Sequence, residues 1–332
     1  MLQLMLHSHP RIAVPPETRF LVPAYQKRRV FGDMRAAAAR ESLASWIVGD
    51  RSTKFRELGI DREAYLRQVA EGPGSLGSVI GTAFKMYADR FAKARWGDKR
   101  PSYVKQVDML LRLFPDAQFV HLIRDGRDCV ASLKEMPWYT LDSFHAISTW
   151  AEAIDAGVKL RRTMPEESYY ELRYEDLTDD PSTELKKLCH FLEEDFDQAM
   201  ISPRAAADMA VPVHKVWHSN THGEVTKARV GSWTKRLDPW EINLAEQVLA
   251  TRLEANGYLL AGAGKPAREH VLAFQKTHQK RKGARLRKSM IDRFNRLREP
   301  GPVAALLTSG QQARHGSFQS DDAMALEGLT RF

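Results

Sequence analysis

The chain has 332 residues, of which 43% are hydrophobic and 28% are charged, and this composition excludes a disordered or fibrous protein. Its formal net charge is +8, but residues 265–300 alone carry twelve Lys or Arg residues against three acidic residues. The 264 residues before this segment are therefore neutral overall, and the high isoelectric point does not indicate a nucleic-acid partner for the body of the chain.

Signals for export are weak in this sequence. The opening MLQLMLHSHP has no basic region and no cleavage site, so we expect no signal peptide. No apolar run approaches the length of a membrane span. The two cysteines, Cys129 and Cys189, fall in helix-like segments, which favours a reducing compartment and predicts a cytoplasmic protein.

Hydrophobic periodicity and turn residues predict the elements in chain order. We expect helices over residues 1–8, 36–48, 61–71, 76–95, 103–114, from 126 onward, 140–162, 181–194 and 238–255. We expect strands over residues 118–123 and 168–173, an extended stretch over 11–23 and a long loop over 210–237. Strands that alternate with helices predict an α/β fold with a parallel sheet flanked by helices. We assign this domain to residues 1–262 and a basic, partly helical or disordered extension to residues 263–332.

The strongest chemical signal is FVHLIRDGRDCVASL, residues 119–133. An apolar strand ends at Arg124, a tight turn opens a helix, and Ser132 lies about two turns into that helix. Asp125 and Asp128 have the spacing of a capping box. An anion bound at this strand end would meet a guanidinium and the free N–H groups of a helix N-terminus. On these grounds alone, a capped helix with Arg124 and Arg127 in surface ion pairs is the favoured interpretation.

The string resembles the 3′-phosphate-binding motif of sulfotransferases that use 3′-phosphoadenosine-5′-phosphosulfate (PAPS), an Arg-Asp-x-Arg-Asp run followed by Ser. Four further segments resemble this family in the same order: residues 6–21, 97–125, 172–192 and 229–237. Together they cover roughly residues 1–260. The resemblance, which is greatest to the tyrosylprotein sulfotransferase branch, implies a fold like that of P-loop nucleotide kinases, with PAPS as sulfuryl donor and a hydroxyl acceptor.

The resemblance also implies roles for individual residues. Arg124 and Ser132 would bind the 3′-phosphate, and Tyr174 would lie at a strand end near the adenine. Lys227, Arg229 and Trp233 are candidates for closing the site, with Trp233 packing either on the base or on the core. Lys99 is a candidate for pairing with the sulfuryl oxygens, with a solvated lysine as the alternative.

Transfer to an alcohol or phenol requires a general base, and Glu17 is our candidate for it. In tyrosylprotein sulfotransferases, a Glu in a similar Glu-Thr-Arg context serves as base. A surface Glu17–Arg19 pair is the alternative interpretation. His7 and His9 are rival bases, because many other sulfotransferases use a histidine.

The family's 5′-phosphosulfate loop, a Pro-Lys/Arg-Ser-Gly-Thr-Thr-like segment, does not occur in this sequence. Met1 aligns just after it. We therefore expect that the recorded start is late, that the first strand and the loop lie upstream, and that the chain as written is marginally stable and a poor catalyst.

Several alternatives stay open at this stage. A truncated, non-catalytic protein that binds through its basic tail is the main one, and a nucleotide kinase is disfavoured because no Walker A string occurs. The acceptor is predicted only as a small molecule, a sugar or a phenol, in a pocket formed by the helices of residues 24–95.

Residues 284–298 predict a basic amphipathic helix, which would contact an anionic membrane, an acidic partner or the protein's own body. His214, His218 and His222 fall in a loop-like segment without a carboxylate or Cys to complete a site, so we expect no metal.

Overall fold

A computed structural model describes residues 1–202, 227–262 and 264–306. Its strands are β1 (Ile12–Ala13), β2 (Arg95–Trp96), β3 (Phe119–Ile123) and β4 (Tyr169–Arg173). Its helices are α1 (Leu2–Ser8), α2 (Leu21–Gln26), α3 (Arg28–Phe31), α4 (Ala37–Gly49), α5 (Arg62–Glu71), α6 (Leu76–Asp89), α7 (Val107–Leu113), α8 (Gly126–Lys134), α9 (Ser143–Thr163), α10 (Tyr174–Asp179), α11 (Pro181–Phe191), α13 (Pro239–Ala255) and α14 (Arg268–Arg296).

The strands form two parallel pairs, which confirms the predicted α/β class. In the first pair Ile12 lies opposite Arg95, and in the second β3 and β4 align over their whole length, from Phe119 opposite Tyr169 onward. Helices α8 and α9 connect β3 to β4, as parallel neighbours require. Among the described residues no ladder joins the two pairs, so they form two separate two-stranded sheets.

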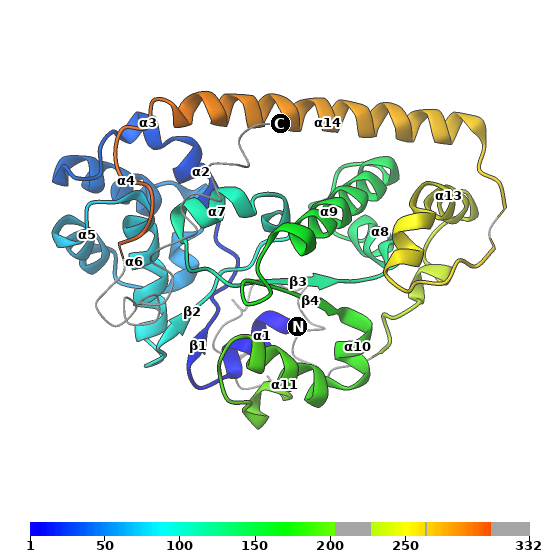
Figure 1. The fold of residues 1–332 in the computed structure, drawn as a ribbon, viewed down its shortest axis with the longest axis horizontal. Coiled ribbons are helices and arrows are strands. Elements are labelled where there is room, and N and C mark those ends of the chain that lie inside the picture. The colour runs from blue at the N-terminus through cyan, green and yellow to red at the C-terminus, as the bar shows by residue number, and fades with distance from the viewer. Residues whose placement is uncertain (203–226, 263, 307–332) are drawn as a thin grey trace.

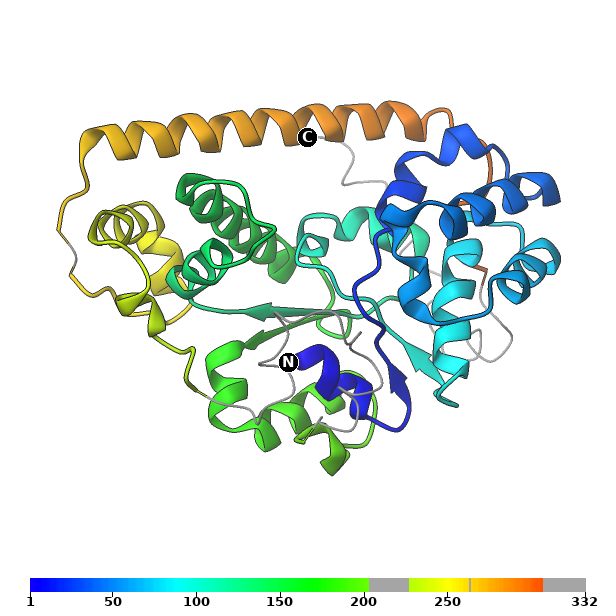
Figure 2. The same cartoon turned by 180° about the vertical axis from the view of Figure 1, so that it is seen from behind.

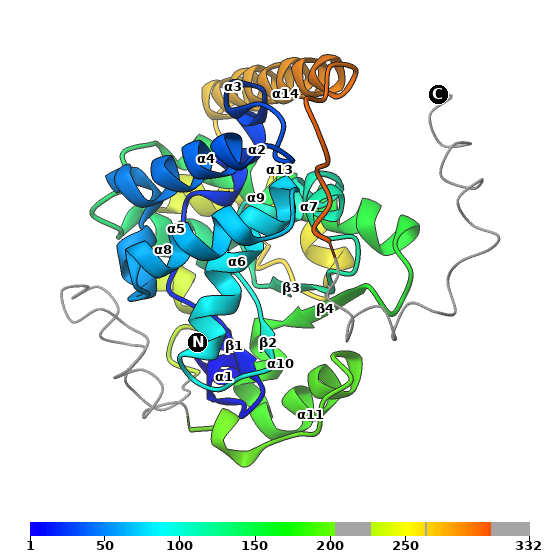
Figure 3. The ribbon, with the colours of Figure 1, turned by 90° about the vertical axis from the view of Figure 1, so that its left-hand side faces the viewer.

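Three of the hydrophobic clusters in the described part of the chain hold most of these elements together. One lies among α4, α5 and α6, which face the viewer in Figure 3, and another lies among α8, α9 and α13. The third joins the two strand pairs, because Ile12 and Val14 pack with Val120 and Leu172 against α1 and α11. Figure 2 shows α1 and α11 on the same side of β3 and β4. The third cluster therefore fixes the ends of both strand pairs relative to one another.

Some boundaries differ from the predicted ones for local reasons. The stretch 11–23 is not extended throughout, because α2 begins at Leu21 and accommodates Pro23 in its first turn. Helix α6 ends at Asp89 instead of residue 95, because Arg95 and Trp96 form β2. The segment 103–114 begins with one turn of 3₁₀ helix, and α7 starts at Val107.

Helix α14 crosses one edge of the molecule, from α13 to α3 (Figure 1). Beyond it, the chain returns to α6, where the Gly77 N–H donates to the Val303 carbonyl at 2.8 Å and the Leu76 N–H donates to the Pro302 carbonyl at 3.0 Å. The basic segment is thus a single helix of 29 residues that contacts the body of the protein. The division of the chain at residue 262 remains a prediction.

Candidate functional site

The first candidate site lies where β3 ends and α8 begins. The Asp125 carboxylate caps α8 by accepting a hydrogen bond from the Arg127 N–H at 2.8 Å, as the sequence predicts. The predicted capping box is wrong, because Asp128 does not turn back to the start of the helix. It reaches instead to residues 231–233, where the N–H groups of Gly231 and Trp233 donate to it at 2.8 and 2.9 Å.

Arg124 leaves β3 beside this cap and contacts three different segments. Its guanidinium lies over the ring of Tyr174, 4.6 Å from the ring centre, and donates to the carbonyl of Arg229. The Asp128 carboxylate lies 3.7 Å from the same guanidinium. Within the described part of the chain, Nε of Arg124 is shielded from solvent and has no hydrogen-bond partner. A charged donor without a partner is costly when buried, so this geometry suits an additional anionic ligand.

Two predicted ligands flank Arg124. Tyr174 is the first residue of α10 and follows β4 directly, so it lies at the strand end predicted for it. Ser132 lies on α8, half-buried, and the structure gives its hydroxyl no hydrogen-bond partner among the described residues. Arg124 and Tyr174 are thus in contact, and Ser132 shares the capped helix that follows Arg124.

The predicted closing residues behave differently from one another. Lys227 forms an ion pair with Asp179, and Arg229 pairs with Glu135 at 3.2 Å; both cations are exposed. Trp233 is 6% exposed and lies in the cluster among α8, α9 and α13, with the Arg127 guanidinium 4.1 Å from its ring centre. Of the two roles considered for Trp233, the structure shows packing on the core.

The sequence did not identify Asp128 as the residue that holds this closing segment. Its carboxylate is fully buried and receives three hydrogen bonds, including one from the Ser232 hydroxyl at 3.0 Å. The local spacing of Asp128 suggested a helix cap. Its actual partners, residues 231–233, lie about a hundred positions further along the chain, so the local sequence does not indicate them. Asp128 therefore couples Arg124 to the segment that carries Arg229 and Trp233.

A second candidate cluster surrounds Glu17. Its carboxylate oxygens lie 3.4 Å from the Lys99 ammonium, 3.8 Å from Arg100 and 3.9 Å from Arg19. The structure therefore brings Glu17 and Lys99 together, and it also contains the predicted alternative pair with Arg19. A carboxylate among three cations, only 26% exposed, is held at a fixed place.

Asp98 orders this second cluster and was not singled out from the sequence. It accepts hydrogen bonds from the Thr18 hydroxyl at 3.3 Å, from the Lys99 N–H at 2.9 Å and from the Tyr103 hydroxyl. Burial raises the pKa of Asp98 to about 6, although these hydrogen bonds oppose the shift. Thr18 is next to the proposed base Glu17 in the chain, and Lys99 is itself a candidate catalytic residue. Asp98 therefore helps to position the two residues Glu17 and Lys99.

The rival bases His7 and His9 have structural roles. The His7 ring is buried, and its Nδ1 accepts a hydrogen bond from the Val14 N–H at 3.1 Å. The His9 ring is also buried, accepts from the Arg11 N–H at 3.1 Å and donates to the Asp195 carbonyl at 2.8 Å. Both rings connect α1 to neighbouring segments, which leaves Glu17 as the more accessible candidate base.

Burial, reinforced by the Lys93 ammonium, lowers the pKa of His7 from 6.5 to about 4. The unfolded chain therefore binds more protons between pH 6.5 and pH 4, and the free energy of unfolding should fall as the pH drops through this window. We expect a loss of about 3 kcal/mol from this group, and His7→Asn, which keeps an acceptor for Val14, should remove that pH dependence. Urea unfolding at several pH values measures it. The exposed His190→Asn variant is the control, and an equal slope in the His7→Asn protein and the wild type would contradict the assignment.

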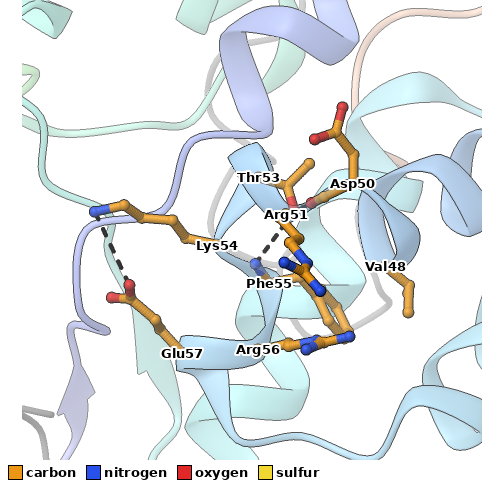
Figure 4. Close-up of a pocket in the computed structure, with 8 residues that line it drawn as sticks. All are labelled: Val48, Asp50, Arg51, Thr53, Lys54, Phe55, Arg56 and Glu57. Atoms are coloured by element: carbon orange, nitrogen blue, oxygen red, sulfur yellow. Dashed lines mark hydrogen bonds and ion pairs between the residues drawn. The ribbon is translucent and has the colours of Figure 1, made fainter.

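A pocket of about 470 Å³ lies next to the Glu17 cluster, and Figure 4 shows its side chains. It is lined by Val48, Asp50, Arg51, Thr53, Lys54, Phe55, Arg56 and Glu57. The Thr53 carbonyl accepts a hydrogen bond from the Arg19 N–H at 2.8 Å, which joins the pocket wall to the segment of Glu17. Lys54 adopts a left-handed backbone conformation, with φ 58°, a strained geometry for a residue other than glycine.

Within the described ranges, no group of three or more His, Cys, Asp or Glu side chains is arranged to hold a metal ion. His214, His218 and His222 lie outside the described residues. The helices of the described segments include none that is both long and apolar enough to cross a bilayer.

Comparisons with known proteins agree on one family. A sequence model described as the sulfotransferase family matches residues 1–198. The chain is 23% identical over 229 residues to a protein-tyrosine sulfotransferase of Drosophila melanogaster, covering 66% of this chain and 41% of that protein. It is 23% identical over 206 residues to protein-tyrosine sulfotransferase A of Caenorhabditis elegans, covering 60% and 48%.

A shorter match joins this chain to a bacterial enzyme. It is 29% identical over 107 residues to an omega-hydroxy-beta-dihydromenaquinone-9 sulfotransferase of Mycobacterium tuberculosis, covering 28% of this chain and 27% of that protein. The chain therefore spans less than half the length of each of these three relatives.

Solved structures resemble the fold over most of the chain. The sulfotransferase domain from the curacin biosynthetic pathway superposes with a TM-score of 0.52 at 18% identity, covering 78% of this chain and 93% of that domain. The sulfotransferase domain from the Synechococcus PCC 7002 olefin synthase gives a TM-score of 0.52 at 21% identity, covering 76% and 89%. At these identities the likeness concerns the fold.

Proposed function

The chain belongs to the sulfotransferase family, and from this premise we propose that it transfers a sulfuryl group from PAPS to a hydroxyl acceptor. The observation that carries the proposal is Arg124, whose guanidinium lies at the end of β3 against the ring of Tyr174 and keeps a shielded Nε without a partner in the described part of the chain. A 3′-phosphate would supply the missing acceptor. The residues present therefore fit the part of PAPS that distinguishes it from AMP and ADP.

The remaining residues have complementary roles in this proposal. Ser132 would donate its hydroxyl to the same phosphate, and Lys227 and Arg229 would exchange their surface carboxylate partners for nucleotide oxygens. Lys99 would hold the sulfuryl oxygens, since PAPS supplies a sulfuryl group attached to a phosphate that departs with negative charge. Glu17 would take the proton from the acceptor hydroxyl, and its ion pair with Lys99 places the two groups side by side.

We propose a phenol as the acceptor, with sugars and other small hydroxyl compounds as alternatives. Two relatives are protein-tyrosine sulfotransferases, and a tyrosine side chain is a phenol. The pocket of Figure 4 lies within the predicted acceptor region of residues 24–95 and adjoins Glu17 through the hydrogen bond from Arg19 to Thr53. Its lining combines the apolar side chains of Val48 and Phe55 with charged residues such as Arg51 and Arg56, which suits the aromatic ring and the hydroxyl of a phenol.

The first test is nucleotide binding, measured by calorimetry or thermal shift. The protein should bind 3′-phosphoadenosine 5′-phosphate more tightly than AMP or ADP. Because a charge-assisted hydrogen bond contributes about 1.5–3 kcal/mol, Arg124→Ala should weaken that binding by at least about tenfold. The exposed Arg67→Ala on α5 is the matched control and should change nothing. Equal affinity for AMP and the 3′-phosphorylated nucleotide in the wild type would reject the site.

Two further points concern the cellular compartment and the alternative of a non-catalytic protein. Cys129 and Cys189 are both free, which supports the proposed cytoplasmic location. No observation in residues 1–202, 227–262 or 264–306 favours a non-catalytic protein that acts through its basic tail.

A further inference from the structure

Helix α14 turns charged side chains toward the protein and apolar side chains toward solvent over its second half, the opposite of an ordinary surface helix. Its inner face is apolar only near its start, where Phe274 packs into the cluster among α8, α9 and α13. Further along, the inner face is ionic: the fully buried carboxylate of Glu152 on α9 pairs with Arg281 at 2.8 Å and with Arg285 at 3.5 Å. Surface helices normally turn their apolar side toward the protein. The second half of α14 is held by charge instead.

The far end of α14 is held in the same way. Asp292 accepts a hydrogen bond at 3.3 Å from Arg28, an arginine of α3 that is only 2% exposed, and Arg28 also pairs with Glu299. These contacts fix the rotation of the helix about its own axis. The side opposite Asp292 must therefore face away from the body.

Four apolar side chains occupy that opposite side, and we name them the outer stripe: Leu286, Met290 and Phe294 on α14, and Leu297 at its C-cap, which keeps a helical backbone conformation. Their spacing of four, four and three residues places them on one face of a helix. They are 57%, 70%, 50% and 84% exposed. Single exposed apolar residues are common, but a row of four on one helix face marks a contact surface.

Cations flank the outer stripe on both sides. Lys282 and Arg293 lie on one side and Arg287 and Arg298 on the other, and all four are exposed. Between residues 270 and 298 the only carboxylate is Asp292, which faces Arg28. The outward surface of this half of α14 therefore combines apolar and positive groups without a negative one.

We propose that the outer stripe docks on the surface of a membrane rich in anionic lipids. Leucine, methionine and phenylalanine would enter the boundary between headgroups and acyl chains, while the flanking Lys and Arg would pair with lipid phosphates. A helix of 29 residues is about 43 Å long, and its position along one edge of the molecule lets it lie flat on such a plane (Figures 1 and 2). A second copy of the chain fits less well, because two outer stripes would bring like charges together.

Co-sedimentation of the full chain with vesicles tests the proposal without any activity assay. The protein should bind vesicles that contain phosphatidylserine, bind vesicles of phosphatidylcholine alone at least about tenfold more weakly, and detach as salt rises from about 0.1 M to about 0.5 M. Leu286→Glu should weaken binding to the anionic vesicles by at least about tenfold, because it places a carboxylate in the stripe. Circular dichroism should show an unchanged fold.

A matched leucine provides the control. Leu141 is 51% exposed in the segment before α9, so Leu141→Glu adds the same charge at similar exposure and should leave vesicle binding unchanged. No binding to anionic vesicles, equal binding to both vesicle types, or equal losses in the two variants would each overturn the proposal. A wild-type dimer that Leu286→Glu dissociates would instead assign the stripe to a second copy and would also overturn it.

Discussion

Replacing Glu17 with Gln should lower sulfuryl transfer to a phenolic acceptor by about 100-fold or more while leaving binding of 3′-phosphoadenosine 5′-phosphate nearly unchanged. The amide keeps the size of the side chain but cannot accept a proton from the acceptor hydroxyl. Glu17 lies 3.4 Å from Lys99, the proposed partner of the sulfuryl oxygens, and 3′-phosphoadenosine 5′-phosphate has no sulfuryl group, so turnover and binding of this nucleotide should respond separately. Transfer from PAPS to a tyrosine-containing peptide measures the first, and calorimetry measures the second.

The matched control for this experiment is Glu41→Gln, which changes an exposed carboxylate on α4. Its turnover should equal that of the wild type. Unchanged turnover in Glu17→Gln, combined with inactive His7 or His9 variants, would move the role of base to a histidine. A loss of nucleotide binding in Glu17→Gln would show that Glu17 acts through the donor site.

The second large effect is expected at Arg28. Arg28→Met should lower the free energy of unfolding by about 3 kcal/mol, because it removes one partner from a buried ionic cluster. Arg28 pairs with Asp292 and Glu299, donates to the Tyr25 carbonyl at 2.8 Å and lies 4.0 Å from the centre of the Tyr25 ring. Both carboxylates keep another cation, Arg296 and Arg112 respectively, which places the expected loss near the lower end for such pairs.

The neighbouring residue is an internal control for this measurement. Arg29 also reaches α14, donating to the Asn295 side chain at 3.0 Å, but it is exposed. Arg29→Met should therefore change the free energy of unfolding by less than about 0.5 kcal/mol. Urea unfolding of both variants measures the two free energies of unfolding. Equal losses of stability in both variants would show that burial of Arg28 does not cause the effect.

Local signals predicted most of the helices and the longer strands. The strand pair β3 and β4, the cap at Asp125 and the long helices α9 and α13 follow from hydrophobic period and capping residues near one another in the sequence. The two-residue strands β1 and β2 carry no such period, because each exists only through its pairing with the other. The outward rotation of the apolar side of α14 depends on partners as distant as Arg28, so no local pattern reveals it.

The candidate site was predictable to a similar extent. The family resemblance paired Arg124 with Ser132 for the 3′-phosphate and placed Tyr174, Glu17 and Lys99 in the same active site. The structure shows contacts between Arg124 and Tyr174 and between Glu17 and Lys99. The resemblance did not indicate that Asp128 and Asp98 organise the two clusters. The role of each carboxylate depends on the hydrogen-bond donors around it, and several of these donors lie far away in the sequence. The functional roles themselves, like the predicted strand and loop upstream of Met1, remain predictions.

The ionic attachment of α14 has a consequence for the lifetime of the folded state. Arg28 and Asp292 are 264 positions apart, so their contact closes a loop that includes most of the chain. Because closing so long a loop is entropically costly, we expect this contact to form late in folding, after the local helices and β3–β4. Interactions absent from the transition state act on the unfolding rate and leave the folding rate almost unchanged. We therefore expect Arg28→Met to accelerate unfolding in stopped-flow experiments, so that the closure by α14 governs how long the native protein persists.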